Sequence, residues 1–418
     1  MKKQRKHINL SRITAFILSI AMLAGFCPQG VSFADIPITL PKVNAAENIS
    51  NPRIVKDSSM DAGQKVTWDC VYFGKYPQSE ITSKDGSIYN TLKNATGWDE
   101  NNDIRIGEAK YRRLKGEDAT YATSSNSPYN YDWNDNHKTY HYFKYEPIKW
   151  RVLNRNGNDA LLLADVALDD QEYNTYYEDV TWETSSMRSW LNGYGASVNQ
   201  PKIDYSRKNF INSAFTSTQR NAIKTTNVVN NNNINDGTAG GNNTSDKVFL
   251  LSESEVYNTD TAAGYGFGKD YSTYDEARRS RCSTYAYAMG TYRDYNTDAE
   301  YTKYNGNIWW WLRSPGHYSY NAAEVDYYGW VDKCGSYVHY WNVGVRPALH
   351  LNLSSSNLYS YAGTVCSDAM KSGESGTDNP VKPSEPDESD TPNQPAHPDK
   401  PGTATGTRTE EGNVDIEM

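Results

Sequence analysis

Strand-like alternation of apolar and polar residues marks the beginning of a central region of the chain. Residues 66–73 alternate in this way, and so do residues 148–153. The polar segment 154–159 contains an Asn-Gly pair and leads into the apolar run 160–164. Because such a pair between two apolar runs favours a tight turn, we predict a strand over 66–73 and a hairpin over 148–164.

Helical spacing replaces this alternation in the middle of the region. Caps at Thr184–Ser186, Thr216 and Ser252 predict three short helices, and Phe210–Phe215 predicts another. Gly193 is expected to end the first, because glycine readily adopts the left-handed conformation of a helix C-cap. The last part of the region returns to strands. These are predicted over 246–251, 308–313, 325–331 (with Gly329 as a bend) and 343–351.

These elements predict one α+β domain over residues 66–353, with antiparallel strands at both ends around short central helices. Long irregular surface loops are expected at 230–235, which is rich in Asn, and at 265–274, which is rich in Tyr. Residues 35–65 would be an N-terminal linker, and 354–370 the exit from the domain. Residues 371–418 consist largely of Pro, Asp, Glu, Ser and Thr, a composition that predicts a disordered tail.

The first 34 residues are typical of a secretory signal peptide. They carry five Lys or Arg residues and no acid, and an apolar run covers residues 13–26. That run is shorter than the ~20 residues needed to cross a bilayer. Ser32 and Ala34 supply the small residues of a cleavage site. We therefore predict a secreted or cell-surface protein with no membrane span after cleavage.

Charge and cysteine content narrow the classes of function. The formal net charge is −9, and no cluster of Lys and Arg follows residue 12, which argues against nucleic-acid binding. Four cysteines would remain after cleavage, at Cys70, Cys282, Cys334 and Cys366. None has the close spacing of a redox or zinc motif. Disulfides and free thiols are both compatible with this pattern.

Six segments together carry a resemblance to a known family. They cover residues 72–78, 147–153, 187–192, 248–252, 310–316 and 344–349, and include Trp-Trp-Leu-Arg-Ser-Pro-Gly and Gly-Val-Arg-Pro-Ala-Leu. In this order they resemble a domain-of-unknown-function family common in exported proteins of Gram-positive gut bacteria. The resemblance covers residues 66–353 and implies location and fold rather than chemistry. More distantly, the strands resemble the C-type-lectin-like fold, which formylglycine-generating enzymes and bacterial adhesins share.

Several arrangements could support an enzyme or a metal site. Formylglycine-type oxidation needs two cysteines close together, and no second cysteine lies within a few residues of Cys334. Nucleophilic catalysis would pair Cys282 or Cys334 with a histidine, and glycoside hydrolysis would use two acids on one strand. The histidines are His317, His339 and His350, and the acids are Glu324 and Asp326. Segments 99–103 and 132–136 alternate oxygen ligands but lack the Gly and Glu of an EF-hand loop. No cofactor is predicted, and calcium is the alternative that these loops leave open.

The aromatic residues give the prediction of function. The chain has 33 Tyr and 11 Trp but only 9 Phe, and many of these rings lie beside Asn, Asp or Ser. Sugar rings stack on aromatic side chains while polar neighbours bind hydroxyls. We predict a module that binds a glycan or a host protein; the alternatives are a hydrolase of cell-wall or mucin polymers and a structural surface protein. The candidate ligand-binding residues are Arg313, His317, Tyr318, Tyr320, Asn321, Asp326, Tyr328, Trp330, Tyr340 and Trp341.

Overall fold

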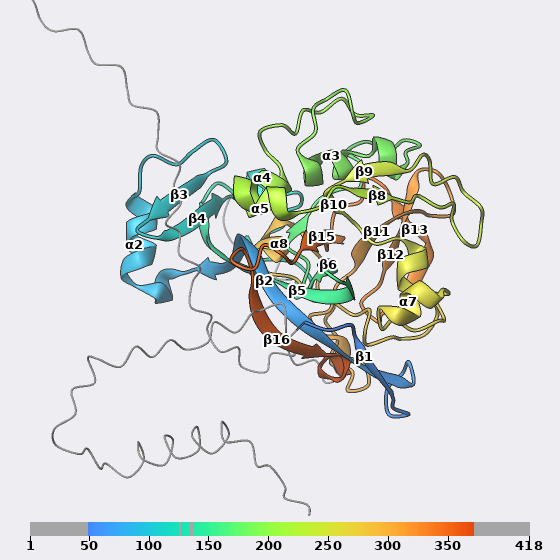
Figure 1. The fold of residues 1–418 in the computed structure, drawn as a ribbon. Helices are drawn as coiled ribbons and strands as arrows, with labels where there is room; N and C mark the ends of the chain where they lie inside the picture. The colour runs from blue at the N-terminus through green and yellow to red at the C-terminus, as the bar shows by residue number, and fades with distance from the viewer. Residues whose placement is uncertain (1–48, 125–126, 134–136, 372–418) are drawn as a thin grey trace, which may run out of the picture. The chain divides into compact units, whose positions relative to one another are not determined.

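The computed structural model describes residues 49–124, 127–133 and 137–371. In these ranges the chain is a mixed α+β fold, with mostly antiparallel strands and short helices (Figure 1). The predicted signal peptide and the tail beyond residue 371 lie outside the described residues. No helix in the described ranges is both long enough and apolar enough to cross a membrane.

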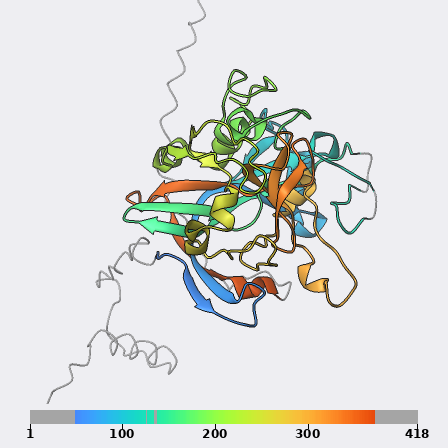
Figure 2. The ribbon, with the colours of Figure 1, turned by 90° about the vertical axis from the view of Figure 1, so that its right-hand side faces the viewer.

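The larger sheet has nine strands among the described residues. Its main path runs β1 (Arg53–Lys56), β2 (Gln64–Ile81), β5 (His141–Asn156), β6 (Asp159–Ala164), β15 (Ala348–Asn352) and β10 (Val248–Phe249). On its flanks, β16 (Ser360–Cys366) pairs with β2, and β4 (Ala109–Leu114) joins β5 to β3 (Asp103–Ile106). Strands β1, β2 and β16 run together along one edge (Figure 2). The sheet therefore extends beyond the predicted limits of 66 and 353 at both ends.

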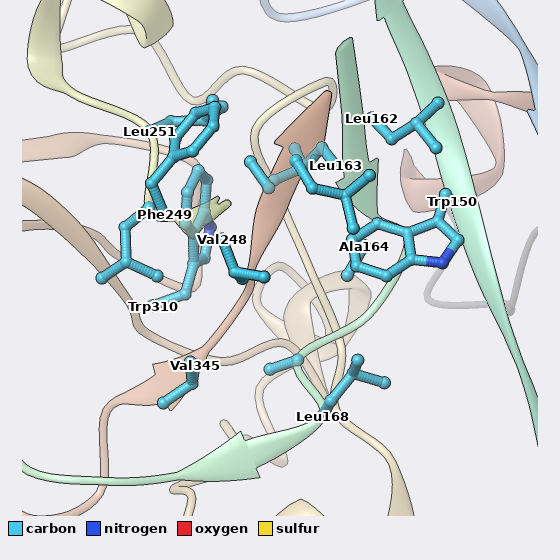
Figure 3. Close-up of a cluster of buried hydrophobic side chains, with 14 of the residues drawn as sticks. Trp150, Leu162, Leu163, Ala164, Leu168, Val248, Phe249, Leu251, Trp310 and Val345 are labelled. Carbon is cyan, nitrogen blue, oxygen red and sulfur yellow. The ribbon is translucent and has the colours of Figure 1, made fainter. Parts of the chain in front are cut away.

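The predicted hairpin at the centre of this sheet is confirmed. Asn156 pairs with Asp159, so that Gly157 and Asn158 form a two-residue turn, and Gly157 has a positive φ of 59°. Trp150 of β5 is fully buried, and its indole Nε1 donates to the carbonyl oxygen of Phe73 at 2.7 Å. Figure 3 shows Trp150 beside the leucines of β6, where β5, β6 and β15 meet the rest of the core.

The second sheet lies in the C-terminal part of the fold and carries the aromatic segments. Its order is β13 (Val331–Tyr337), β12 (Asn321–Val325), β11 (Trp310–Pro315), β14 (Gly344–Val345) and β7 (Asp169–Asp170). The predicted strand over 325–331 is wrong, because β12 ends at Val325 and β13 begins at Val331. The residues between them form a hairpin turn, in which Asp326 Oδ1 accepts hydrogen bonds from the backbone N–H groups of Tyr328 and Trp330, both at 2.8 Å.

The four predicted helices are confirmed. Ser185 caps α3 (Ser186–Asn192), and Gly193 ends it with a φ of 72°. The others are α4 (Phe210–Ala214), α5 (Ser217–Ala222) and α6 (Glu253–Val256), and the structure adds α2 (Ser87–Asn94), α7 (Asp260–Gly264) and α8 (Thr284–Met289). The predicted strand over 246–251 divides in two. Its first residue belongs to β9 (Thr244–Asp246), which pairs with β8 (Thr226–Val228), and the rest contains β10.

A buried carboxylate holds the middle of the chain together. Asp246 is fully buried and accepts four hydrogen bonds. The donors are Trp182 Nε1 at 3.1 Å, Arg188 Nε at 2.8 Å, Thr244 Oγ1 at 2.7 Å and the Tyr194 hydroxyl at 3.2 Å. Since these side chains come from α3, its flanking turns and β9, one carboxylate fixes several segments at once.

The two loops predicted on the surface are partly buried. Asn233 in the Asn-rich loop is only 2% exposed, and its Nδ2 donates to the carbonyl oxygens of Pro315 at 3.0 Å and Lys333 at 2.9 Å. The Tyr-rich loop buries Phe267 in the core. The prediction from polarity fails for Asn233 because its amide satisfies backbone carbonyls of the second sheet.

Candidate functional site

Seven aromatic side chains meet at the open end of the β12–β13 hairpin, away from its turn. We call them the tyrosine patch, which consists of Tyr177, His317, Tyr318, Tyr320, Tyr337, His339 and Tyr340. Neighbouring ring centroids are 4.3–6.0 Å apart. Tyr177 and Tyr318 are both 53% exposed, and Tyr340 is 42% exposed. The patch is therefore an aromatic surface that solvent reaches, rather than part of the core.

Strand pairing brings most of these rings together. Asn321 at the start of β12 pairs with Tyr337 at the end of β13, and the N–H of Val338 donates to the carbonyl oxygen of Tyr320 at 3.0 Å. The rings that precede β12 therefore lie beside those that follow β13. Tyr318 stacks on Tyr320 with an interplanar angle of 20° and a centroid distance of 5.1 Å.

Tyr177 reaches the patch from the loop that follows β7. Two backbone hydrogen bonds attach this loop to the hairpin, from Asn174 N to Val338 O at 2.7 Å and from Val180 N to Ser319 O at 3.0 Å. The Tyr177 ring then lies 5.0–5.2 Å from the rings of Tyr320, Tyr337 and His339. The position of Tyr177 thus depends on contacts between distant parts of the sequence.

Carboxylates lie at the rim of the patch. Asp236 Oδ1 is 3.1 Å from Nδ1 of His317, and Asp179 Oδ1 accepts a hydrogen bond of 2.6 Å from the Ser319 hydroxyl. Both acids are exposed. The rim therefore offers carboxylate and hydroxyl oxygens next to aromatic faces.

The structure brings four of the ten predicted residues together, namely His317, Tyr318, Tyr320 and Tyr340. Three others lie elsewhere. Tyr328 packs among other tyrosines, Trp330 lies near Tyr271, and Trp341 stacks face to face on Tyr121 at 3.6 Å. Sequence reasoning missed Tyr177, Tyr337 and His339 as site residues. Tyr337 and His339 lie in the same aromatic run as Tyr340, and this run was the signal in the sequence that could have identified them.

The remaining three predicted residues are buried and have structural roles. Arg313 forms an ion pair with Glu255 and donates to the carbonyl oxygen of Leu250. The side chain of Asn321 donates to Gly335 O at 2.8 Å. Asp326 holds the hairpin turn described above. These side chains satisfy groups of the chain itself, and none of them belongs to the tyrosine patch.

A second polar feature is a cavity of about 200 Å³ next to β7. Its lining includes Gln171, Glu172, Thr120, Thr175, Ser186 and Trp190. Burial raises the pKa of Glu172 to about 7. No motif in the sequence pointed to this cavity, because its lining comes from separate segments.

Comparison with known protein families matches one segment of the chain, and this segment contains the tyrosine patch and most of the cavity lining. Residues 157–353 match the profile of one sequence family. That family is DUF6273, a domain of unknown function. The DUF6273 segment runs from β6 to β15 and includes the whole tyrosine patch and Glu172, whereas the predicted resemblance began at residue 66. No curated protein and no solved structure matches the chain.

The structure describes the thiols and acids of the DUF6273 segment that were considered for catalysis. Burial raises the pKa of the Cys282 and Cys334 thiols, the reverse of what an activated nucleophile requires. The backbone N–H of His317 donates to the carbonyl oxygen of Cys334 at 2.9 Å. Glu324 is fully buried, and Asp326 lies in the turn, so the two acids do not share an exposed strand face. All four cysteines in the described residues are free thiols.

The segments considered for calcium lie outside the DUF6273 segment. In 99–103, Asp99 Oδ1 accepts hydrogen bonds from the N–H groups of Asn101 and Asp103, and the Asp103 carboxylate pairs with Arg112. These oxygens are therefore occupied by the chain's own donors. Residues 134–136 of the other segment lie outside the described residues. The described residues contain no group of three or more His, Cys, Asp or Glu side chains that could hold a metal ion.

The raised pKa of Glu172 in the DUF6273 segment predicts a pH-dependent effect on stability. A carboxyl with a pKa near 4.3 in the unfolded chain and about 7 in the folded chain favours folding most when it is protonated. Its contribution is therefore fully present below pH 4 and is lost as the pH rises through 7. We expect Glu172→Gln to raise the melting temperature at pH 8 and to change it far less at pH 5. A difference independent of pH would contradict this account.

Proposed function

We propose that the tyrosine patch binds a glycan and that the chain is an exported or cell-surface carbohydrate-binding module. The observation that carries this proposal is the group of seven contacting rings, several of them strongly exposed. Apolar faces of sugar rings stack on aromatic side chains, and hydroxyls then reach polar groups at the edge of the site. Asp179, Asp236 and Ser319 supply such groups.

The rim charges favour a neutral glycan. Asp179 and Asp236 lie beside the rings, and the whole chain has a formal net charge of −9. Like charges repel, so sulfated or sialylated sugars would bind less well than neutral ones. Weaker binding of charged glycans than of their neutral counterparts would support this assignment.

The remaining parts of the proposal concern fold family and location. We place the α+β unit with C-type-lectin-like domains and expect cleavage of the signal peptide after Ala34. Antiparallel strands around short helices agree with the C-type-lectin-like assignment. The basic and apolar pattern of the N-terminus supports cleavage of a signal peptide. Mass spectrometry of secreted protein that begins at Asp35 would support export.

Removing two exposed rings should abolish most of the glycan binding. We expect the double variant Tyr318→Ala, Tyr340→Ala to bind neutral glycans about 10-fold more weakly or worse, since each aromatic contact contributes about 0.5–1.5 kcal/mol. A glycan array would select the ligand, and isothermal titration calorimetry would measure its affinity. Circular dichroism would verify that the variant is folded.

Tyr295→Ala is the matched control, because Tyr295 is 44% exposed but lies among other tyrosines, next to Tyr129. It should leave glycan affinity unchanged. Binding that is lost in Tyr295→Ala and kept in the double variant would move the site to that second cluster. Absence of binding to any glycan, with capture of a host surface protein by the wild-type chain alone, would replace the glycan by a protein ligand.

A further inference from the structure

Several buried carboxylates in the described residues are paired with cations. Asp246 is 2.8 Å from Arg188, Asp103 is 2.7 Å from Arg112, and Glu255 contacts Arg313. Such pairs offset the cost of removing a charge from water. The fold therefore supplies a counter-ion for some of the acids that it buries.

Other buried acids accept hydrogen bonds in place of a cation partner. Asp169 accepts from the Tyr76 hydroxyl, from Gln171 Nε2 at 3.2 Å and from its neighbour's backbone N–H at 2.8 Å. Glu253 accepts from the N–H of Ile234 at 3.1 Å. These carboxyl groups have their partners within the protein.

Glu172 differs from both groups. Its side chain is partly buried, yet it has no hydrogen bond or ion pair with any described residue. Loss of solvent is the only cause of its raised pKa, so no cation of the described chain compensates for its charge. Its hydrogen-bond partners must therefore come from solvent or from a ligand.

The cavity beside Glu172 has the chemistry to receive that partner. Its volume of about 200 Å³ would hold about six water molecules, or one small polar ligand of similar size. Thr120, Thr175 and Ser186 provide hydroxyls, and Trp190 and Tyr205 provide aromatic surface. No lysine or arginine is among the described residues that line it.

We infer that this cavity binds a compact ligand that carries a protonated primary amine and hydroxyl groups, with Glu172 as the counter-ion of the amine. A carboxylate and aromatic rings together suit an ammonium group, because both attract positive charge. The hydroxyls of the lining would exchange hydrogen bonds with those of the ligand. Amino sugars and ethanolamine belong to this chemical class. The inference does not rest on glycan binding by the tyrosine patch.

The test compares two ligands that differ only in the amine. Glucamine, the open-chain amino alcohol, and glucitol, its hydroxyl counterpart, would be titrated into the full chain at pH 8 and followed by calorimetry and ligand-observed NMR. We expect the wild-type chain to bind glucamine at least 10-fold more tightly than glucitol. Glu172→Gln, which keeps size and loses charge, should remove this preference, and Glu172→Asp should weaken it.

Two control variants separate this site from the others. Glu178→Gln changes an acid of the same loop whose carboxylate already accepts a hydrogen bond from Asn174 at 3.0 Å, and it should bind glucamine normally. The variant Tyr318→Ala, Tyr340→Ala should also bind glucamine normally, even though it loses glycan binding. Equal affinity for the two ligands, unchanged binding by folded Glu172→Gln, or no binding of glucamine by the wild-type chain would overturn the inference.

Discussion

Replacing Asp246 with alanine is expected to lower the free energy of unfolding by about 3–5 kcal/mol. The substitution leaves the guanidinium of Arg188, which is largely buried, without its carboxylate, and it removes the acceptor of the Trp182 indole N–H. A buried cation and a buried donor without partners both cost free energy. Denaturation by urea, followed by tryptophan fluorescence, would measure the loss.

Glu100→Ala is the control for Asp246→Ala. Glu100 also pairs with an arginine, Arg207, but both side chains are at least half exposed. Because exposed ion pairs contribute little, we expect a change of less than about 1 kcal/mol. Similar losses in the two variants would show that burial of Asp246 does not have the energetic consequence proposed here.

Replacing Gly335 with alanine is expected to cost about 2–5 kcal/mol and to weaken glycan binding. Gly335 has a φ of 70°, and a Cβ atom there would lie 2.1 Å from the carbonyl oxygen of Ala322 on β12. The positive φ costs about 1–2 kcal/mol for a non-glycine residue, and relief of the clash adds about 1–3 kcal/mol. Since β13 continues from Gly335 to Tyr337, displacement of the strand should also disturb the tyrosine patch.

Gly363→Ala isolates the effect of the backbone angle. Gly363 has a φ of 75°, but no atom lies within 4 Å of the position of its Cβ. Alanine there should cost only about 1–2 kcal/mol and leave glycan affinity unchanged. Thermal and chemical denaturation of both variants would compare them. Equal losses of unfolding free energy in Gly335→Ala and Gly363→Ala would mean that β12 and β13 accommodate an added methyl group at little cost.

Local elements could be predicted from the sequence because neighbouring residues determine them. The Gly157-Asn158 turn and the Ser185 cap of α3 depend on side chains within a few positions of each other. Helices and turns of this kind have their signals in short stretches of the chain. The aromatic run 337–341 likewise pointed to the end of the β12–β13 hairpin where the tyrosine patch lies.

The rest of the site depends on contacts between distant residues. Tyr177 meets Tyr337 only because the loop after β7 is hydrogen-bonded to the hairpin, and nothing near Tyr177 in the sequence indicates this. Trp330 and Trp341 are exposed, but their separation from the patch could not be inferred without the turn and the Tyr121 stack. Glu172 was missed because what distinguishes it is the lack of a partner, which a sequence does not display.

The DUF6273 match begins inside a hairpin of the larger sheet. Residue 157 lies in the turn between β5 and β6, so the matched segment contains β15 but leaves out β5, the other strand that pairs with β6. Five of the six residues of β6 are buried, and without β5 the strand would present an apolar, unpaired edge of the kind that drives aggregation. A gene fragment cut at this boundary would therefore encode a poor folding unit. Other chains that carry the segment are expected to supply an equivalent of β5 from their own preceding sequence.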